Sequence, residues 1–547
     1  MTTVQSKPED QAEPDGVIRS LIPARLDRLG WSRFHTRLVL ALGVAWVLDG
    51  LEITIASNST SLLSSPHSLH LSSAGVAFAV GTVYLLGEVA GALFFGRLSD
   101  KWGRRNLFMI TLGVYLIGGA LTACVAGTGA GWVWFLYFCR FVAGMGIGGE
   151  YAAINSAIDE LIPARYRGRV DIAVNGTYWG GALIATVVTL VIINHLPIAY
   201  SWRIAFLVGP ALGFVILFVR KNLPESPRWL IMHGRVKEAE EAVSQIERAT
   251  KATGGALDEV DESKEIEIRP ASDIGFFALA RTLFTTYPRR AILGASLMIT
   301  QSFLYNAIFF TYALVLTKIY GVGSGSVPYY FMVFAAGNLA GPLLIGRFFD
   351  SLGRRKMIGG TYLLSGVLLA VTAELFRAGT LDAVTQTLCW CVIFFFASAG
   401  ASAAYLTVSE IFPVEVRAKA IAVFFAIAQC FGAFGPWFYG KLIGNGSDHF
   451  ALFIGYIVGA AVMLVGGAME AFIGVNAERR SLEDLALPLG AVEARGGHLS
   501  SVTGAPRPPA ARSVTGTPSP SLAETLERRQ ERREEARRHR RFRDDSA

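Results

Sequence analysis

Twelve apolar stretches, each long enough to cross a lipid bilayer as a helix, occupy most of this 547-residue chain. A membrane-spanning helix needs about 20 apolar residues, because each residue adds only about 1.5 Å along the helix axis. Only 17% of the residues are charged, whereas soluble domains carry about 25%. The predicted spans are 36–58, 73–98, 106–126, 132–155, 170–193, 202–220, 290–317, 326–349, 357–378, 383–408, 418–442 and 450–475. The sequence therefore predicts an all-α integral membrane protein with twelve transmembrane helices.

The loops between these spans differ in their content of basic residues, and this difference predicts the orientation. Lys and Arg gather on the cytoplasmic side of membrane proteins. Alternate loops hold most of them here: Lys101, Arg104 and Arg105; Arg165, Arg167 and Arg169; Arg347, Arg354, Arg355 and Lys356; Arg417 and Lys419. The intervening loops hold few, so both termini are predicted to be cytoplasmic.

The chain divides into five predicted segments. They are a cytoplasmic N-terminal segment (1–35), a six-helix half (36–220), a cytoplasmic linker (221–289), a second six-helix half (290–475) and a basic tail (476–547). In the linker, Val236, Ala239, Val243 and Ile246 recur at intervals of three or four, which predicts a helix with one narrow apolar stripe. The tail is too charged to bury a core, which predicts disorder.

The two halves of the membrane region repeat one another. The stretch GRLSDKWGRR begins at Gly96, and GRFFDSLGRR begins 250 residues later at Gly346. The same offset relates Glu160 to Glu410. Two separate motifs that match at one offset indicate a duplicated six-helix unit. Parallel duplication of this kind builds one large class of secondary transporters.

Four motifs resemble those of the major facilitator superfamily, and within it the sugar-porter and metabolite:proton symporter branches. They are GRLSDKWGRR after span 2, RFVAGMGIGGEY at 140–151, PESPRWL at 224–230 and SEIFPVEVRA at 409–418. Together they extend over nearly the whole membrane region, from about residue 36 to 475. The resemblance implies two parallel six-helix repeats that expose a central cavity to each side of the membrane in turn.

The motifs at the helix ends predict a cytoplasmic gate between the halves. Gly96 and Gly103 have no side chain, which allows helices 2 and 11 to approach and the loop to turn sharply. Asp100 can accept from a helix N-terminus or pair with a following arginine. The resemblance implies that this gate closes when the cavity opens outward. The predicted gate residues are Gly96, Asp100, Gly103, Arg104, Arg105, Glu160, Arg167, Asp350, Arg354, Glu410 and Arg417.

Ionisable residues within the spans are candidates for proton coupling, because each costs about 2.5–3.5 kcal/mol on insertion scales. Asp49 and Glu52 are three residues apart, so they share a face of helix 1. In proton-coupled sugar porters an Asp on helix 1 and an Arg on helix 4 form the coupling site, and the resemblance assigns these roles to Asp49 and Arg140. The predicted proton-coupling residues are Asp49, Arg140, Glu52 and Glu88. A static buried ion pair is the alternative interpretation of Asp49 and Arg140.

The second half offers neutral donors and acceptors within its spans. The stretch TQSFLYNAIFFTY resembles the sugar-porter pattern that places Gln and Asn on the substrate, although Thr300 and Phe310 depart from it. The predicted substrate-binding residues are Gln301, Asn306, Tyr312, Asn338, Tyr405, Gln429 and Trp437, with Asn175 and Tyr178 on helix 5. Such groups can hydrogen-bond hydroxyls and stack on an apolar ring face. For any one of them, helix packing is the alternative role.

These observations predict a proton-coupled symporter of a small polar organic solute, such as a sugar or polyol, in a bacterial cytoplasmic membrane. Its partners are the solute, protons and the lipid bilayer, and it is predicted to act as a monomer, without nucleic acid. The proton gradient replaces any cofactor or metal, and the sequence lacks the enzymatic motifs of P-loops, zinc sites and nucleophile elbows. Helix 1 also resembles that of organic-acid and vitamin-precursor symporters. That function, a drug:proton antiporter and a non-transporting sensor are the alternatives.

Overall fold

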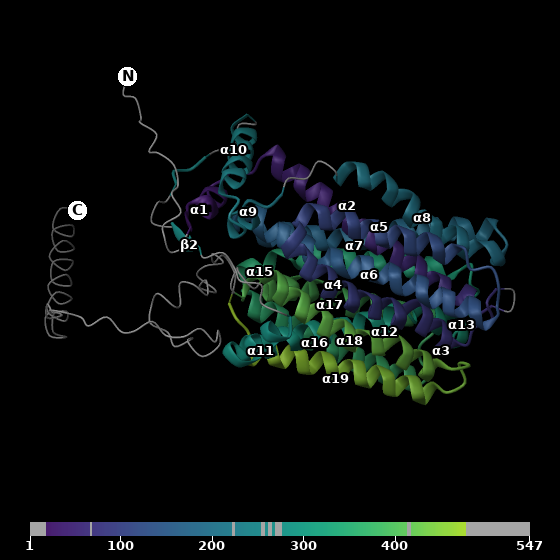
Figure 1. Ribbon diagram of the computed structural model, residues 1–547. Helices are drawn as coiled ribbons and strands as arrows, with labels where there is room; N and C mark the ends of the chain where they lie inside the picture. The colour runs from purple at the N-terminus through teal and green to yellow at the C-terminus, as the bar shows by residue number, and fades with distance from the viewer. Residues whose placement is uncertain are drawn as a thin grey trace, which may run out of the picture. The chain divides into compact units, whose positions relative to one another are not determined.

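The computed structural model describes residues 18–65, 68–220, 225–252, 257–260, 265–268, 276–412 and 417–476. Long helices that run side by side make up most of it (Figure 1). Eleven helices in these ranges are long and apolar enough to cross a membrane, and Ile198–Phe214 is a shorter apolar helix. The twelve predicted spans are therefore all present as helices in the described chain, which confirms the predicted fold class.

The first half consists of six spans, of which the second changes its helical form near its start. They are α2 (Arg33–Leu63); α3 (Ser73–Ala77), η1 (Phe78–Thr82) and α4 (Val83–Trp102); α5 (Arg104–Ala123); α6 (Ala130–Leu161); α7 (Ala164–His195); and α8 (Ile198–Arg220). The segment η1 is a single π-helical turn that joins α3 to α4. Within this half, α2 packs on α7 and α4 packs on α6.

The second half repeats this arrangement. Its spans are α12 (Pro288–Phe309) with α13 (Tyr312–Lys318), α14 (Val327–Ile345) with α15 (Arg347–Ser351), α16 (Arg354–Arg377), α17 (Ala383–Glu410), α18 (Arg417–Ile443) and α19 (His449–Ile473). The pair α12 and α18 corresponds to α2 and α7, and the pair α14 and α17 corresponds to α4 and α6. Equivalent spans thus pack on one another in the same pairs in both halves, which confirms the internal duplication.

The halves meet most extensively where α4 packs on α18 and α7 packs on α14. A Cβ atom on Gly96 of α4 would lie 3.2 Å from the Cβ of Ala422 on α18. The close approach of helices 2 and 11 that the sequence predicted is therefore confirmed. Gly103 and its equivalent Gly353 have φ angles of 83° and 102°, which only glycine adopts without strain. Both motifs thus make the predicted sharp turn before the next helix.

Glycines also allow close backbone contact within the first half, and this contact is testable. A Cβ atom on Gly148 of α6 would lie 2.0 Å from the backbone oxygen of Glu88 on α4. Gly148→Ala should therefore separate the two helices and cost about 1–3 kcal/mol of unfolding free energy. Gly113→Ala is the control, because nothing lies within 4 Å of the Cβ position there. Thermal unfolding in detergent should show a lower midpoint for the first variant alone; equal midpoints would contradict this packing.

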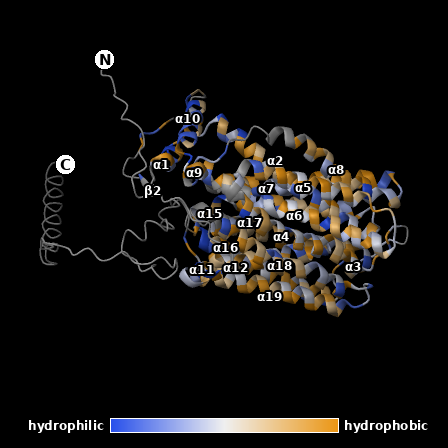
Figure 2. Ribbon diagram, viewed as in Figure 1, coloured by the Kyte–Doolittle hydropathy of each residue, from blue (hydrophilic) through white to orange (hydrophobic). Residues whose placement is uncertain are grey.

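The linker helices gather at one end of the bundle, called here the linker end. They are α9 (Pro227–Met232), α10 (Val236–Ala252) and α11 (Phe276–Thr286), and the short helix α1 (Ile22–Asp27) lies with them. Strands β1 (Ile18–Ser20) and β2 (Ile266–Ile268) pair antiparallel. Ala239, Val243 and Ile246 of α10 are buried, which confirms the predicted apolar stripe. Figure 2 shows hydrophobic residues along the long helices and hydrophilic ones around α10.

Salt bridges hold α1 on α10. Glu247 accepts from Arg25 at 2.9 and 3.0 Å and from Arg28 at 2.7 Å. Burial alone would raise the pKa of Glu247, but the hydrogen bonds from Arg25 and Arg28 outweigh it and the pKa is lowered. A lowered carboxyl pKa stabilises the docked state above the pKa of the undocked residue, and this contribution is lost as the pH falls through the lowered pKa.

Glu247→Gln should therefore release α1 at neutral pH, with amide exchange in residues 22–27 roughly tenfold faster. Wild-type exchange, corrected for the intrinsic effect of pH, should rise only when the pH falls below about 4.5, whereas the variant should show a smaller rise, because Glu240 still pairs with Arg25. Glu238→Gln is the control, because Glu238 pairs with Arg235 on the exposed side of α10. Hydrogen exchange measured by mass spectrometry checks this; slow exchange in Glu247→Gln would contradict the proposed contact.

Candidate functional site

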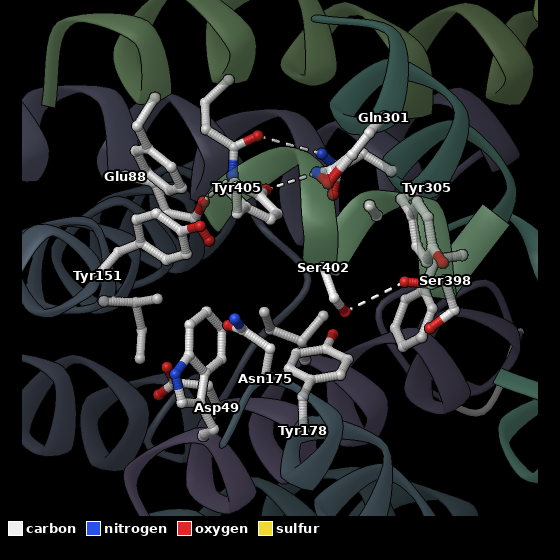
Figure 3. A pocket seen from close by; sticks show the side chains of 18 of the residues that line it. Asp49, Glu88, Tyr151, Asn175, Tyr178, Gln301, Tyr305, Ser398, Ser402 and Tyr405 are labelled. Atoms are coloured by element: carbon white, nitrogen blue, oxygen red, sulfur yellow. Dashed lines mark hydrogen bonds between the residues drawn. The ribbon is translucent and has the colours of Figure 1, made fainter. Parts of the chain in front are cut away.

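A cavity lies between the two halves (Figure 3). The first half contributes residues of α2, α4, α6 and α7, and the second half contributes residues of α12, α17 and α18. The lining residues are Trp46, Asp49, Ile53, Glu88, Ile147, Tyr151, Asn175, Tyr178, Trp179, Gln301, Tyr305, Asn306, Phe309, Ser398, Ala401, Ser402, Tyr405, Phe425 and Gln429. Both halves thus supply polar and apolar groups to one site.

Aromatic rings form much of the cavity wall and bridge the halves. Tyr151 of α6 stacks on Phe425 of α18, with ring centroids 4.4 Å apart. It also lies 5.1 Å from the ring of Tyr405 and 5.3 Å from that of Trp46. Trp179 of α7 lies 5.9 Å from Phe309 of the other half. Such walls suit a solute with a flat apolar face.

Two carboxylates, Asp49 and Glu88, line the same cavity (Figure 3). Asp49 is 4% exposed and Glu88 is 2% exposed. Glu88 accepts a hydrogen bond from Nε2 of Gln429, which lies on the opposite half. Oε1 of Gln429 in turn accepts from Ser302 and, at 3.2 Å, from Asn306 Nδ2. A continuous hydrogen-bonded chain therefore connects α4 with α18 and α12.

Arg140 forms a buried ion pair with Glu52 behind the cavity wall. Its Nη1 lies 2.7 Å from Oε1 of Glu52, and neither side chain is exposed. The guanidinium also lies over the rings of Tyr84 and Phe206, 4.4 and 5.2 Å from their centroids. The predicted pairing of Arg140 with Asp49 is therefore wrong for this conformation. Glu52, one helical turn further along α2, reaches the guanidinium, while Asp49 faces the cavity.

Six of the nine predicted substrate-binding residues line the cavity. They are Gln301, Asn306, Tyr405, Gln429, Asn175 and Tyr178. Gln301 Nε2 donates to the hydroxyl of Tyr405, so two of them are already joined.

The other three predicted residues lie elsewhere. Tyr312 is buried with its hydroxyl 3.1 Å from Thr387 Oγ1. Trp437 is 37% exposed and packs on Phe434. Asn338 lies behind the wall, where its Oδ1 accepts from Tyr305 at 3.3 Å. These three predictions of direct substrate contact do not hold in this conformation, because each polar group faces its own half or the outer surface.

The sequence analysis missed several cavity residues that share a helix face with predicted ones. Ser398 and Ser402 precede Tyr405 on α17 by about two turns and one turn, so all three face the same way. Trp46 and Ile53 flank Asp49 on α2 in the same manner. Helical periodicity from one established residue could have found them. The rings of Tyr151 and Phe425 had no such signal, because packing between the halves brings them together.

Two of the predicted gate residues, Arg354 and Glu410, pair with each other within the second half. Arg354 of α16 forms a salt bridge with Glu410 of α17, and each side chain is 4% exposed. This salt bridge joins two helices of the second half, and the lock between the halves stays a prediction. Glu160, the equivalent of Glu410, is also buried. The side chains of Asp100, Arg104, Arg105, Arg167, Asp350 and Arg417 lie outside the described part of the structure.

Comparisons with known proteins agree with this architecture. The niacin transporter NiaP of Acinetobacter baylyi is 26% identical over 466 residues, which cover 85% of this chain and 99% of that protein. Synaptic vesicle glycoprotein 2B of Mus musculus is 29% identical over 274 residues, 48% of this chain and 39% of the relative. The proton:xylose symporter XylE bound to 6-bromo-6-deoxy-D-glucose shares the fold, with a TM-score of 0.67 and 20% identity over 82% of this chain and 98% of XylE.

Residues 50–486 match the family described as sugar (and other) transporter. This range includes nearly all of both six-helix halves and every residue of the cavity wall except Trp46 and Asp49. The family and the fold are those of transporters. The chain therefore belongs to the sugar (and other) transporter family.

Proposed function

We propose that this protein is a proton-coupled symporter of a small polar organic solute that works by alternating access. The observation that carries the proposal is the central cavity, in which Asp49 and Glu88 of one half face neutral donors and acceptors of the other. We further propose that it acts in the plasma membrane as a monomer, with the linker end in the cytoplasm, as the distribution of Lys and Arg favours.

The connection from Glu88 to Gln429 offers a physical basis for coupling. An ionised carboxylate accepts a strong hydrogen bond from the Gln429 amide, and protonation weakens that bond. The proton on Glu88 thereby alters a contact between the halves, which is what alternating access requires. One proton that enters down a potential of 100 mV supplies about 2.3 kcal/mol, enough for a roughly fiftyfold gradient of a neutral solute.

Uptake of an aromatic vitamin precursor is a second candidate function. The rings of Trp46, Tyr151, Trp179, Phe309 and Phe425 around the cavity favour it, since they suit a planar heterocycle better than a polyol. The similarity to proteins named niacin transporters supports the same candidate.

The test is solute-induced proton flux. Purified protein in liposomes that contain a pH-sensitive dye would be exposed to sugars, polyols, aromatic acids, aromatic amides and lipophilic cations. Acidification by one class, absent in Glu88→Gln and present in the surface variant Glu374→Gln, would support symport. Solute uptake that does not depend on pH in the wild type would contradict coupling, and competition by many unrelated lipophilic cations would instead favour a drug antiporter.

A further inference from the structure

The formal charges in the cavity wall are all negative. Among the described residues that line it, Asp49 and Glu88 are acidic, and none is Lys, Arg or His. A bound carboxylate would therefore meet the like charge of Asp49, and that of Glu88 as well whenever Glu88 has released its proton, in a site where both side chains are buried. Like charges in a protected site repel more strongly than in bulk water, because the effective dielectric constant is lower there.

Arg140 is not available to compensate an anionic solute. Its Nη1 is held by Glu52 at 2.7 Å, and the guanidinium lies against the rings of Tyr84 and Phe206. The side chain is fully buried and is not part of the cavity wall. Rotation of Arg140 toward the cavity would leave Glu52 as a buried charge without its partner, which is strongly unfavourable. Binding of one small carboxylate cannot easily offset such a cost.

The same wall suits a positive charge. Aromatic faces attract cations through their electron-rich surfaces. The rings of Trp46 and Tyr151 lie beside the cavity, and Asp49 is on the same helix as Trp46. Figure 3 shows Asp49 and Glu88 at separate places in the wall, so a cation near Asp49 need not displace the bond from Gln429 to Glu88.

We infer that the solute is an organic cation built on a flat ring, and that the cavity selects against carboxylates of the same shape. This inference rests on the proposed function and specifies its substrate class. Asp49 supplies the counter-charge, the aromatic rings contact the faces of the solute, and Glu88 carries the coupled proton. The cavity therefore differs in its charge preference from a site for an aromatic acid, although a cation and an acid of this kind share the same flat ring.

Three pyridines that differ mainly in charge provide the test: pyridine-3-carboxylate, pyridine-3-carboxamide and its N1-methylated pyridinium cation. Binding to the purified full-length protein would be measured at pH 7 by calorimetry. The expected order of affinity is cation, amide, carboxylate, with the cation at least tenfold tighter than the carboxylate. Asp49→Asn should reduce that ratio about tenfold, whereas Glu374→Gln, which changes an exposed carboxylate, should not alter it.

Binding of the carboxylate as tightly as the cation, or absence of cation binding, would overturn the inference. Proton flux in the same liposome preparation separates this result from the fate of the proposed function. Uptake of the cation without proton movement would support the charge preference and contradict symport. Proton flux driven by the carboxylate would support symport and contradict the charge preference.

Discussion

Arg140→Ala is expected to lower the free energy of unfolding by about 3–5 kcal/mol, because it leaves the carboxylate of Glu52 buried without its counter-charge. The side chains of Glu52 and Arg140 are both inaccessible to solvent, so the remaining carboxylate would lie in surroundings of low effective dielectric constant. Glu52→Ala should cost a similar amount, since the guanidinium would then be the isolated charge. Thermal unfolding in detergent, together with the amount of folded protein recovered, measures both effects.

A double variant shows whether the loss comes from charge or from volume. Arg140→Met combined with Glu52→Leu removes both charges and keeps apolar bulk, so it should be considerably more stable than Arg140→Met or Glu52→Leu alone, each of which keeps the bulk but isolates one charge. Losses that simply add in the double variant would contradict the ion pair. Solute counterflow by the stable double variant tests the role of the ion pair in transport. Retained exchange would indicate that the pair only supports the structure, and loss of exchange would indicate that it takes part in the transport cycle.

The architecture could be predicted from the sequence because its determinants are local. Apolar length sets each span, and the offset between the two GRR motifs reveals the duplication. The glycines that begin the next helix, Gly103 and Gly353, have the backbone angles that their place in the motif implied. Each span, turn and motif is a short continuous stretch, and the duplication follows from a comparison of two such stretches, so no knowledge of packing was required.

The site was predicted less completely because its geometry depends on helix rotation and on contacts between the halves. Asp49 and Glu52 share a face in sequence terms, yet a small difference in direction places Glu52 on Arg140 and Asp49 in the cavity. Gln429 was recognised as a polar group within a span, but its bond to Glu88 joins residues 341 positions apart. Such a contact follows only from the way in which α4 meets α18.

Glu88→Gln should abolish solute accumulation while it preserves solute exchange. Glutamine has nearly the same shape, can still hydrogen-bond Gln429 and binds no proton at physiological pH. With an inward proton gradient equivalent to 100 mV, the wild type should reach a gradient of several tens-fold, and the variant only about equal concentrations. Counterflow, which needs no net proton movement, should stay within about threefold of the wild-type rate. Radiolabelled or mass-spectrometric uptake of the solute found in the flux screen measures both quantities.

Gln429→Ala separates the proton from the bond that transmits it. The carboxylate of Glu88 remains in this variant, but its contact with the second half is lost, together with the acceptor for Ser302 and Asn306. Glu88 should then still bind protons, but its protonation should no longer control whether the two halves approach one another. Protons should therefore leak in the absence of solute. Glu374→Gln should keep full accumulation and show no leak, since that carboxylate lies outside the cavity and pairs with Arg377 on the surface. Persistent accumulation in Glu88→Gln would assign the coupled proton to another carboxylate, with Asp49 the first to examine. Absence of a proton leak in Gln429→Ala would show that the coupling does not pass through the Gln429 amide.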